Sequence, residues 1–239
     1  LSKKSYLISK GTGSTFKAIS KNVLRELTIP VPTLQEQEKQ SGILNTLWRV
    51  ICKRRTQQAK LDELIKCRFV EMFGTYPANE KGWKTGTIRD VIQEARYGAS
   101  RPAVEGGQYP YLRMNNITYG GDLDLSDTKR INVPEAELPK CTVRRGDVLF
   151  NRTNSKELVG KTCVYNRDEM MVLAGFVIRV RVNDSVLPEF LAAFLNAGFS
   201  KHMLLNMCKS AIGQANINAQ EMQDIEIYIP PISSQQEYV

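Results

Sequence analysis

The stretch that decides the fold begins Pro30-Val-Pro-Thr-Leu-Gln-Glu-Gln-Glu-Lys39 and closes on Leu61-Asp-Glu-Leu-Ile-Lys-Cys-Arg-Phe-Val-Glu-Met-Phe-Gly74. The two prolines cannot sit inside a helix, so they mark the end of an extended segment. Thr33 and Glu36 have the spacing of a capping box. No proline interrupts residues 34–73, and Gly74 is the type of residue on which helices commonly end. The pattern predicts one helix over residues 34–73.

Apolar side chains recur on one side of this predicted helix in steps of three and four residues. Polar residues fill the middle of the repeat, as in a coiled coil with a polar centre. At ~1.5 Å per residue, a helix of about 40 residues spans roughly 60 Å, so a domain of this size cannot bury it. We expect a spacer, an arm or half of a helix pair, with an ordinary long surface helix as the alternative. The residues expected to pair are Leu44, Leu47, Ile51, Leu61 and Ile65.

The chain has 239 residues and a formal net charge of +8, a balance that favours nucleic acid or another polyanion as a partner. Its five cysteines form no Cys-x-x-Cys pair, which argues against a disulfide framework or a zinc knuckle and favours a cytoplasmic location. No apolar run reaches the ~18 residues of a membrane span, so we expect no membrane partner. The first residue is Leu1, and a new proline-bounded segment begins just before the end, which predicts a piece of a longer chain or a truncated form.

A stretch near the start of the chain returns near its end. Residues 19–37 align with residues 217–235 without a gap, and Ile19, Pro32 and Gln37 are among the positions with identical counterparts. Each copy predicts a short helical turn, a strand and a proline stop, after which a helix begins. A repeat of this period corresponds to a whole domain with its helix rather than to a solenoid unit.

The residues between the two copies combine short helices with several strands. A short amphipathic helix is predicted at Thr87–Ile92, and Pro188 is expected to begin another helix with an apolar face. Strands are predicted at Tyr109–Met114, Val148–Phe150, Thr162–Tyr165 and Val172–Val182, the last with Ile178, Val180 and Val182 alternating with Arg179 and Arg181. The expected fold class is α+β, with a mixed, largely antiparallel domain attached to a long coiled-coil-forming helix.

The sequence offers little for catalysis. Its only histidine, His202, lies in an apolar helix-like stretch and is interpreted as structural, so neither a histidine-rich metal site nor any other metal site is expected. Gly160-Lys-Thr162 resembles the end of a P-loop, but the required first glycine falls on Ser155, and no cofactor is expected. Asp127-Thr-Lys129 resembles the metal-binding triplet of some nucleases, with a solvated turn as the alternative.

Polar loops follow several of the predicted strands. Arginine and asparagine side chains can pair with the edges of guanine and adenine in the major groove, and lysine and serine suit phosphate oxygens. Between Arg96 and Arg167 the chain holds twelve basic and eight acidic residues. Solvated turns are the alternative interpretation. The residues by themselves predict a basic recognition domain, without catalysis, on a long helical arm.

Two long motifs also resemble a known family. The stretches 29–37 and 61–74 resemble the central conserved region of the specificity subunit of type I restriction-modification systems. Pro110-Tyr-Leu-Arg-Met-Asn-Asn-Ile117 and Gly146-Asp-Val-Leu-Phe-Asn-Arg-Thr-Asn-Ser155 resemble its target-recognition domain. In that family, two such domains each read half of a split DNA site, and antiparallel helices set the gap between the halves. The helices dock methylation subunits, restriction subunits join through them, and the specificity subunit itself catalyses nothing.

The resemblance implies a domain organisation. Residues 1–33 would be the tail of a preceding target-recognition domain, and residues 34–74 the conserved spacer helix. Residues 75–232 would be a target-recognition domain, and residues 233–239 the start of a second conserved helix. Two copies of the chain are expected to be able to pair through residues 34–73 and read a palindromic split site.

The resemblance also implies which side chains contact double-stranded DNA. Loop residues that follow the strands would read bases, and neighbouring basic or hydroxyl residues would contact phosphates. The expected set is Ser100, Arg101, Arg113, Asn115, Asn116, Asn151, Arg152, Asn154, Ser155, Lys156, Lys161, Gln214 and Asn216. Phe69, Met72 and Phe73 are expected to pack the helix against its own domain.

Two other function classes stay open at the level of the sequence. One is a stand-alone metal-dependent nuclease that uses Asp127 and Lys129, which metal-dependent cleavage by the isolated chain would reveal. The other is a helical adaptor that does not bind DNA, which an absence of salt-dependent DNA binding would favour.

Overall fold

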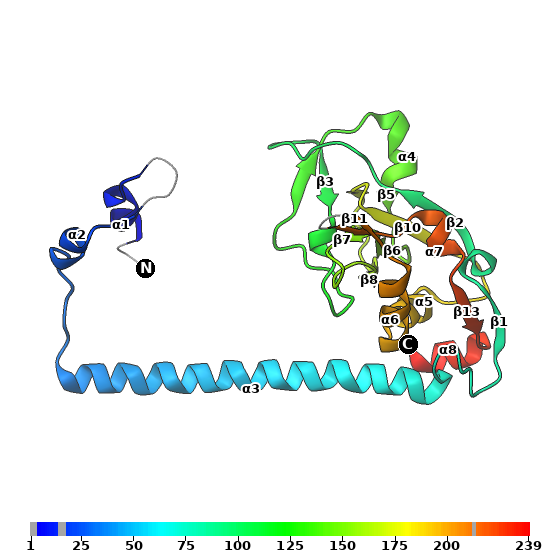
Figure 1. The fold of residues 1–239 in the computed structure, drawn as a ribbon, viewed down its shortest axis with the longest axis horizontal. Coiled ribbons are helices and arrows are strands. Elements are labelled where there is room, and N and C mark those ends of the chain that lie inside the picture. Colours follow the sequence, from blue (N-terminus) through cyan, green and yellow to red (C-terminus); the bar gives the residue numbers. More distant parts are fainter. Residues whose placement is uncertain (1–3, 14–17, 212–213) are drawn as a thin grey trace. The chain divides into compact units, whose positions relative to one another are not determined.

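The structure, a computed structural model, describes residues 4–13, 18–211 and 214–239, without the side chains of residues 209–211 and 214 (Figure 1). The chain forms two compact units, residues 1–57 and residues 58–239. The helix α3 (Leu34–Phe73) contributes its first part to one unit and its last part to the other.

The first unit begins with two short helices, α1 (Lys4–Lys10) and α2 (Lys21–Arg25), neither of which buries a side chain. Ser20 caps α2 by accepting a hydrogen bond of 3.4 Å from the backbone N–H of Val23. The residues that follow, 27–33, form no strand. The strand predicted in the first copy of the repeat is therefore wrong. A strand needs a neighbouring strand to pair its backbone groups, and none of the described strands pairs with these residues.

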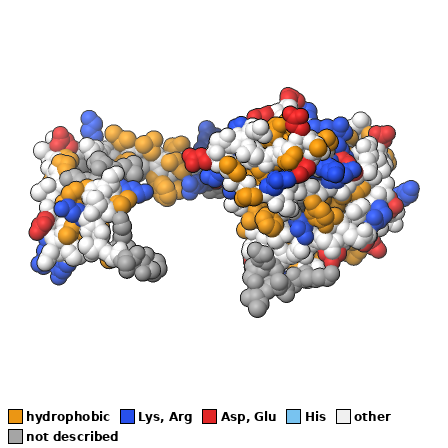
Figure 2. Space-filling view, turned by 90° about the horizontal axis from the view of Figure 1, so that it is seen from above, with side chains coloured by type: hydrophobic (Ala, Val, Ile, Leu, Met, Phe, Trp, Pro, Cys, Tyr) orange, Lys and Arg blue, Asp and Glu red, His pale blue; other side chains and the backbone are white. Residues whose placement is uncertain are grey.

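The long helix has the predicted bounds, Leu34–Phe73. The capping box is present, since Thr33 N–H donates to the Glu36 carboxylate at 2.9 Å and Glu36 N–H donates to the Thr33 hydroxyl at 3.3 Å. The helix ends at Gly74, whose φ of +83° is a conformation that side chains disfavour. All five predicted seam residues are exposed, from 44% for Ile51 to 64% for Leu44. Figure 2 shows hydrophobic side chains gathered along this helix.

The second unit is built on two four-stranded sheets. The first has the antiparallel order β2 (Ile92–Tyr97), β10 (Val177–Val182), β6 (Val148–Asn151), β8 (Thr162–Val164). The second has the order β4 (Lys129–Ile131), β3 (Tyr109–Leu112), β9 (Met171–Leu173), β5 (Thr142–Val143), in which only β3 and β9 are parallel. Two smaller antiparallel sheets join β1 (Lys84–Thr87) to β13 (Glu226–Ile229) and β11 (Lys209–Ala211) to β12 (Gln214–Asn216) and β7 (Thr153–Asn154). The prediction of a mixed, largely antiparallel α+β domain is confirmed.

Short helices complete this unit: 3-10 turns η1 (Ile88–Val91), η2 (Met114–Asn116) and η3 (Glu135–Glu137), and α-helices α4 (Leu138–Cys141), α5 (Pro188–Asn196), α6 (Gly198–Met207), α7 (Ala219–Gln223) and α8 (Ile232–Tyr238). Pro188 begins α5 as predicted, and α5 buries Phe190 and Phe194. The rings of Phe69 and Phe73 lie 5.7 and 5.1 Å from that of Phe190. The end of α3 thus belongs to the core of the second unit, as expected.

Two local predictions need correction. The segment predicted as an amphipathic helix at Thr87–Ile92 is the 3-10 turn η1, which leads directly into β2. The strand predicted over Val172–Val182 is two strands, because a turn closed by a bond of 2.9 Å from Val177 N–H to the Ala174 carbonyl separates β9 from β10. Arg179, which alternates with the apolar residues Ile178 and Val180, is 1% exposed. The second sheet covers this side of β10, and Arg179 donates to the carbonyl of Thr142 on β5.

A network of charges surrounds Arg179. Glu94 accepts from Arg179 at 2.7 Å and from Arg181 at 2.8 Å, and Arg181 also bonds Asp147 at 2.8 Å. Buried charges are tolerated when they are paired and hydrogen-bonded in this way. The network joins β2 and β10 to Asp147, which directly precedes β6.

The internal repeat is present in the structure. Asn218 caps α7 as Ser20 caps α2, at the equivalent position. Leu34 and Ile232, also equivalent, begin α3 and α8. The copies differ between these helices, since the second copy forms β13 on β1 whereas the first forms no strand.

Candidate nucleic-acid interface

The loops that follow β2, β6 and β9 bring together side chains from distant parts of the sequence. Arg152, directly after β6, places its guanidinium carbon 4.9 Å from the centre of the Tyr97 ring at the end of β2. The backbone N–H of Arg152 donates to the Phe176 carbonyl at 3.0 Å. Tyr97 and Phe176 are 43% and 53% exposed. A cation over the Tyr97 ring and the exposed Phe176 segment therefore come together at the surface.

A close backbone approach makes this meeting possible. The N–H of Ala99 donates to the Leu173 carbonyl at 2.7 Å, and the N–H of Gly175 donates to the Ala99 carbonyl at 2.9 Å. A Cβ atom on Gly98 would lie 2.1 Å from the Leu173 carbonyl oxygen, so only glycine fits there. Ser100 follows this segment and is exposed.

The strand pair β7–β12 extends the same surface. Asn154 on β7 lies opposite Ala215, and Asn216 lies opposite Thr153. The Thr153 hydroxyl donates to the Asn216 side-chain oxygen at 3.1 Å. The N–H of Ile217, directly after β12, donates to the Arg152 carbonyl at 2.9 Å, which joins this strand to the loop after β6. We call Tyr97, Ser100, Arg152, Asn154, Phe176 and Asn216 the loop face.

The Arg152 guanidinium is half-buried, and its Nε is buried without a hydrogen-bond partner. In the described part of the chain it has no ion-pair partner, and its interaction with another side chain is the contact with the Tyr97 ring. Stacking fixes the plane of a guanidinium and leaves its edge free to donate two parallel hydrogen bonds. Ser155 and Lys156 follow on the same loop, the first half-buried and the second exposed.

A second group of predicted residues lies at the turn η2. Arg113 bonds the Asp127 carboxylate at 3.0 Å, and Lys129 bonds the same carboxylate at 3.1 Å. Lys129 and Arg113 hold the pKa of that carboxyl below its ordinary value. Asn115 is exposed on this turn, while Arg101, elsewhere on the surface, is paired with Glu137 at 2.7 Å. Arg113 and Arg101 are thus already bound to carboxylates.

Three residues expected to face DNA are buried instead. Asn116 is 2% exposed and accepts from the Arg113 N–H while donating to the Asp124 carbonyl. Asn151 is fully buried and finds partners within the domain in either orientation of its amide. Lys161 is 7% exposed and donates to the carbonyls of Met114 and Ile117. Backbone carbonyls in turns need donors, and these side chains supply them.

Tyr97 and Phe176 do not stand in a polar cluster, so the sequence alone does not single them out. Both lie beside Arg152 because β10 pairs with β2 and β6. Gln214 belongs to β12, but its side chain lies outside the described residues. His202 is exposed on α6, so it is not a core histidine.

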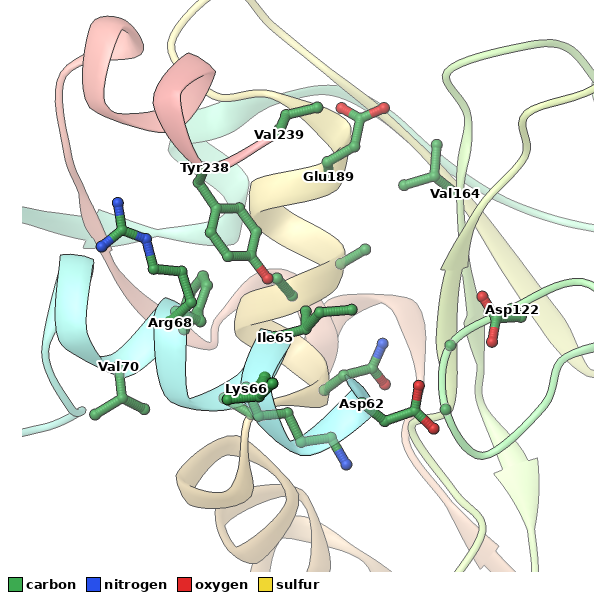
Figure 3. Close-up of a pocket in the computed structure, with 18 of the residues that line it drawn as sticks. Asp62, Ile65, Lys66, Arg68, Val70, Asp122, Val164, Glu189, Tyr238 and Val239 are labelled. Carbon is green, nitrogen blue, oxygen red and sulfur yellow. The ribbon is translucent and has the colours of Figure 1, made fainter. Parts of the chain in front are cut away.

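A pocket of about 760 Å³ lies elsewhere in the second unit, between the end of α3, helix α5, the turn at residues 120–123 and the end of α8. Figure 3 shows the Tyr238 ring pointing toward Ile65. Asp62, Asp122 and Glu189 also line it. Lys66 and Arg68 lie beside these carboxylates, so the charged lining is mixed, and none of the loop-face residues belongs to this pocket.

The described residues hold no group of three or more histidine, cysteine, aspartate or glutamate side chains placed to bind a metal ion. Among the helices of residues 4–13, 18–211 and 214–239, none is both long and apolar enough to cross a membrane. Asp127, the acid of the nuclease alternative, is engaged by two cations.

Comparison with known proteins places these features in context. A family model described as the type I restriction modification DNA specificity domain matches residues 1–61 and 80–239. The EcoKI specificity subunit of Escherichia coli K12 is 25% identical over 229 residues, covering 89% of this chain and 49% of that protein. The StySPI specificity subunit of Salmonella potsdam is 23% identical over the same length, with the same coverage. The chain spans about half the length of these curated relatives.

Solved structures show the same fold. The HsdS subunit of Thermoanaerobacter tengcongensis is 21% identical with a TM-score of 0.53, covering 98% of this chain and 57% of that one. A chain from a structural study of complex assembly and conformational transition of the type I R-M system is 20% identical with a TM-score of 0.55 and the same coverage.

Proposed function

Because this chain belongs to the type I restriction modification DNA specificity domain family, we propose that it recognises double-stranded DNA within a type I restriction-modification complex and catalyses no step itself. The second unit reads part of a split site. The observation that carries this proposal is the loop face, where the Arg152 guanidinium lies over the Tyr97 ring and has no carboxylate partner among the described residues. A guanidinium held in this way suits the O6 and N7 acceptors of guanine.

The other polar residues of these loops, exposed or half-buried, fall into two groups by the chemistry of their side chains. Asn154, Asn216 and Asn115 carry amides that can pair with adenine, and Ser100, Ser155 and Lys156 suit phosphate oxygens. Phe176 offers an apolar contact of the kind made with a thymine methyl group. Arg101 and Arg113 already share their charge with Glu137 and Asp127. Asn116, Asn151 and Lys161 support the loops from inside.

The internal repeat supports the proposed domain organisation. Residues 1–33 serve as the tail of a preceding recognition domain, 34–74 as the spacer helix, 75–232 as a recognition domain and 233–239 as the start of a second spacer helix. Tyr238 of α8 lies 5.4 and 5.6 Å, centre to centre, from the rings of Phe69 and Phe73. The second helix therefore starts in contact with the first.

The exposed seam of α3 supports the proposed partners. Apolar side chains that repeat every three to four residues pair with another helix, which a second copy of the chain can supply. The same helix docks the methylation subunits, and restriction subunits join through them.

The test is selection of random duplexes by the chain mixed with its methylation subunits, at two salt concentrations. Enrichment of a short site is expected, and a split palindrome would add the paired arrangement. An absence of enrichment, with binding that disappears at moderate salt, would leave only non-specific charge attraction and overturn the proposal.

A further inference from the structure

The long helix carries a basic face as well as its apolar seam. Arg49, Lys53 and Lys60 follow one another at steps of four and seven residues, a spacing that keeps side chains on one side of an α-helix. At 100° per residue, this side lies opposite the seam residues Leu44 and Ile51. We call Arg49, Lys53 and Lys60 the basic face of α3.

Positive charge is concentrated on this part of the helix. Residues 39–61 include Lys39, Arg49, Lys53, Arg54, Arg55 and Lys60, and they include no aspartate or glutamate. A stretch of this kind produces a strong local positive potential. All three residues of the basic face are exposed.

The second unit differs in how its cations are used. Arg89, Arg96 and Arg145 each lie within 2.8 Å of a carboxylate oxygen. Within the described residues, none of the three cations of the basic face has such a partner; the side-chain contact of Arg49 is with the Thr46 hydroxyl at 3.5 Å. Carboxylates of the described residues therefore leave the positive charge of the basic face uncompensated.

We propose that the basic face of α3 contacts the phosphate backbone of duplex DNA outside the bases that the loop face reads. The inference rests on the proposed function, because it takes the DNA to be present in the same complex. Arg49 and Lys60 are eleven residues apart, or about 16 Å along the helix axis, which corresponds to roughly five base pairs at ~3.4 Å each.

The arrangement suits DNA better than an acidic protein. Duplex DNA presents one negative charge per ~1.7 Å of its axis, so cations on flexible side chains need no exact register against it. A protein surface presents carboxylates at fixed places, and residues 39–61 offer no carboxylates or apolar anchors on this face to fix such a register. The opposite placement of seam and basic face lets helix pairing and phosphate contact occur together.

The experiment uses the chain assembled with its methylation subunits and the duplex obtained by selection. The triple variant R49Q/K53Q/K60Q removes the basic face and keeps good helix formers. The control K81Q/K84Q/K140Q removes three exposed lysines of the second unit, so the net charge changes equally. Binding is measured from low to moderate salt for the selected duplex and for an unrelated duplex of equal length.

The expected result is a slope of log K against log salt that becomes shallower by about 2 to 3, since each phosphate contact contributes ~0.9. Affinity at low salt falls by about the same factor for both duplexes, and the control variant keeps the original slope. An unchanged slope for R49Q/K53Q/K60Q overturns the inference. If R49Q/K53Q/K60Q no longer assembles with the methylation subunits while the salt slope of its DNA binding is unchanged, the basic face binds an acidic protein surface. That result also overturns the inference.

Failure of the proposed function would look different. In that case the unmodified complex would enrich no sequence at all, whatever the salt slope of the variants. If the unmodified complex enriches a site, but the unmodified chain, R49Q/K53Q/K60Q and the control variant all show the same salt slope, only the phosphate contact is rejected. The proposed function is then retained.

Discussion

Gln37 and Gln235, which occupy equivalent positions in the two copies of the repeat, make the same hydrogen bond. Each donates its side-chain amide to the carbonyl of the proline five residues before it, Pro32 or Pro230, at 2.8 Å. Gln235 is fully buried, and its oxygen also accepts from the Leu187 N–H at 2.7 Å. Gln37 is exposed. The same local bond thus forms at the start of both helices, but only the bond made by Gln235 is buried in a core.

Gln235→Ala is expected to lower the free energy of unfolding of the second unit by about 1–3 kcal/mol, because it leaves the buried Leu187 N–H without a partner. Gln37→Ala, the matched control, is expected to change it by less than about 0.5 kcal/mol. Urea unfolding followed by the fluorescence of Trp83, in a Trp48→Phe background, measures both. Equal effects would contradict the difference in burial.

Arg152→Ala is expected to weaken binding to the selected duplex by about 1–3 kcal/mol and to relax selectivity at one base position, as the loss of a bidentate contact to guanine does. Arg152→Lys should not restore binding, because an ammonium cannot donate two parallel bonds. Competition binding with single-base variants of the site is the measurement.

The stacking on Tyr97 can be tested separately. Tyr97→Phe keeps the ring and removes only the hydroxyl that accepts from the Ala219 N–H at 2.8 Å, so it should retain most of the affinity. Tyr97→Leu removes the ring and should approach Arg152→Ala. If Tyr97→Leu binds as tightly as the unmodified protein, the ring does not position Arg152.

Lys161→Met is expected to destabilise the second unit by about 1–3 kcal/mol, because the carbonyls of Met114 and Ile117 lose a buried donor. The salt slope of DNA binding should not change, since this ammonium group does not face solvent. Thermal unfolding and salt-dependent binding together check the prediction. A shallower slope at full stability would return Lys161 to the set of phosphate contacts.

Lys201 predicts a dependence of stability on pH. Burial lowers its pKa from 10.5 to about 7, and its ammonium nitrogen bonds the Gly160 carbonyl at 2.6 Å. The unfolded chain therefore binds this proton more tightly, so stability is expected to fall as pH decreases from about 10.5 to about 7 and to level off below. Lys201→Met should flatten this part of the curve in urea unfolding at pH 7 and pH 9.5. The Gly160 carbonyl retains the Thr162 hydroxyl as a donor in that variant.

Pairing of two chains through α3 predicts a mass twice that of one chain in light scattering at high concentration. Leu47→Asp puts a charge into the seam and should return the mass to one chain. Thr46→Asp, on a neighbouring position outside the seam, is the control. A mass of one chain at every concentration would reject pairing through this helix.

The features that the sequence predicts well are those set by neighbouring residues. The bounds of α3 follow from a cap at Thr33, an apolar period and a stop at Gly74, all of which act within a few residues. The repeat is also visible because its residues lie in order along the chain.

The features it predicts poorly depend on contacts between distant segments. An asparagine in a polar loop has the same composition signal whether it faces solvent or closes a turn, so the burial of Asn116 and Asn151 could not be inferred. Tyr97 and Phe176 become neighbours only through the pairing around β10. Arg179 follows a regular alternation, but a second sheet covers the side to which it points.

The inward position of Lys161, Asn116 and Asn151 has a thermodynamic consequence. These side chains bond the loops to backbone groups of the folded protein, so the entropy of ordering the loops is lost during folding. Under the proposed function, association with DNA then carries little further ordering cost on the protein side. Under the same proposal, Arg152 and Asn154 can be exchanged for other side chains, and so change the sequence that is read, while Lys161, Asn116 and Asn151 keep the loops in place.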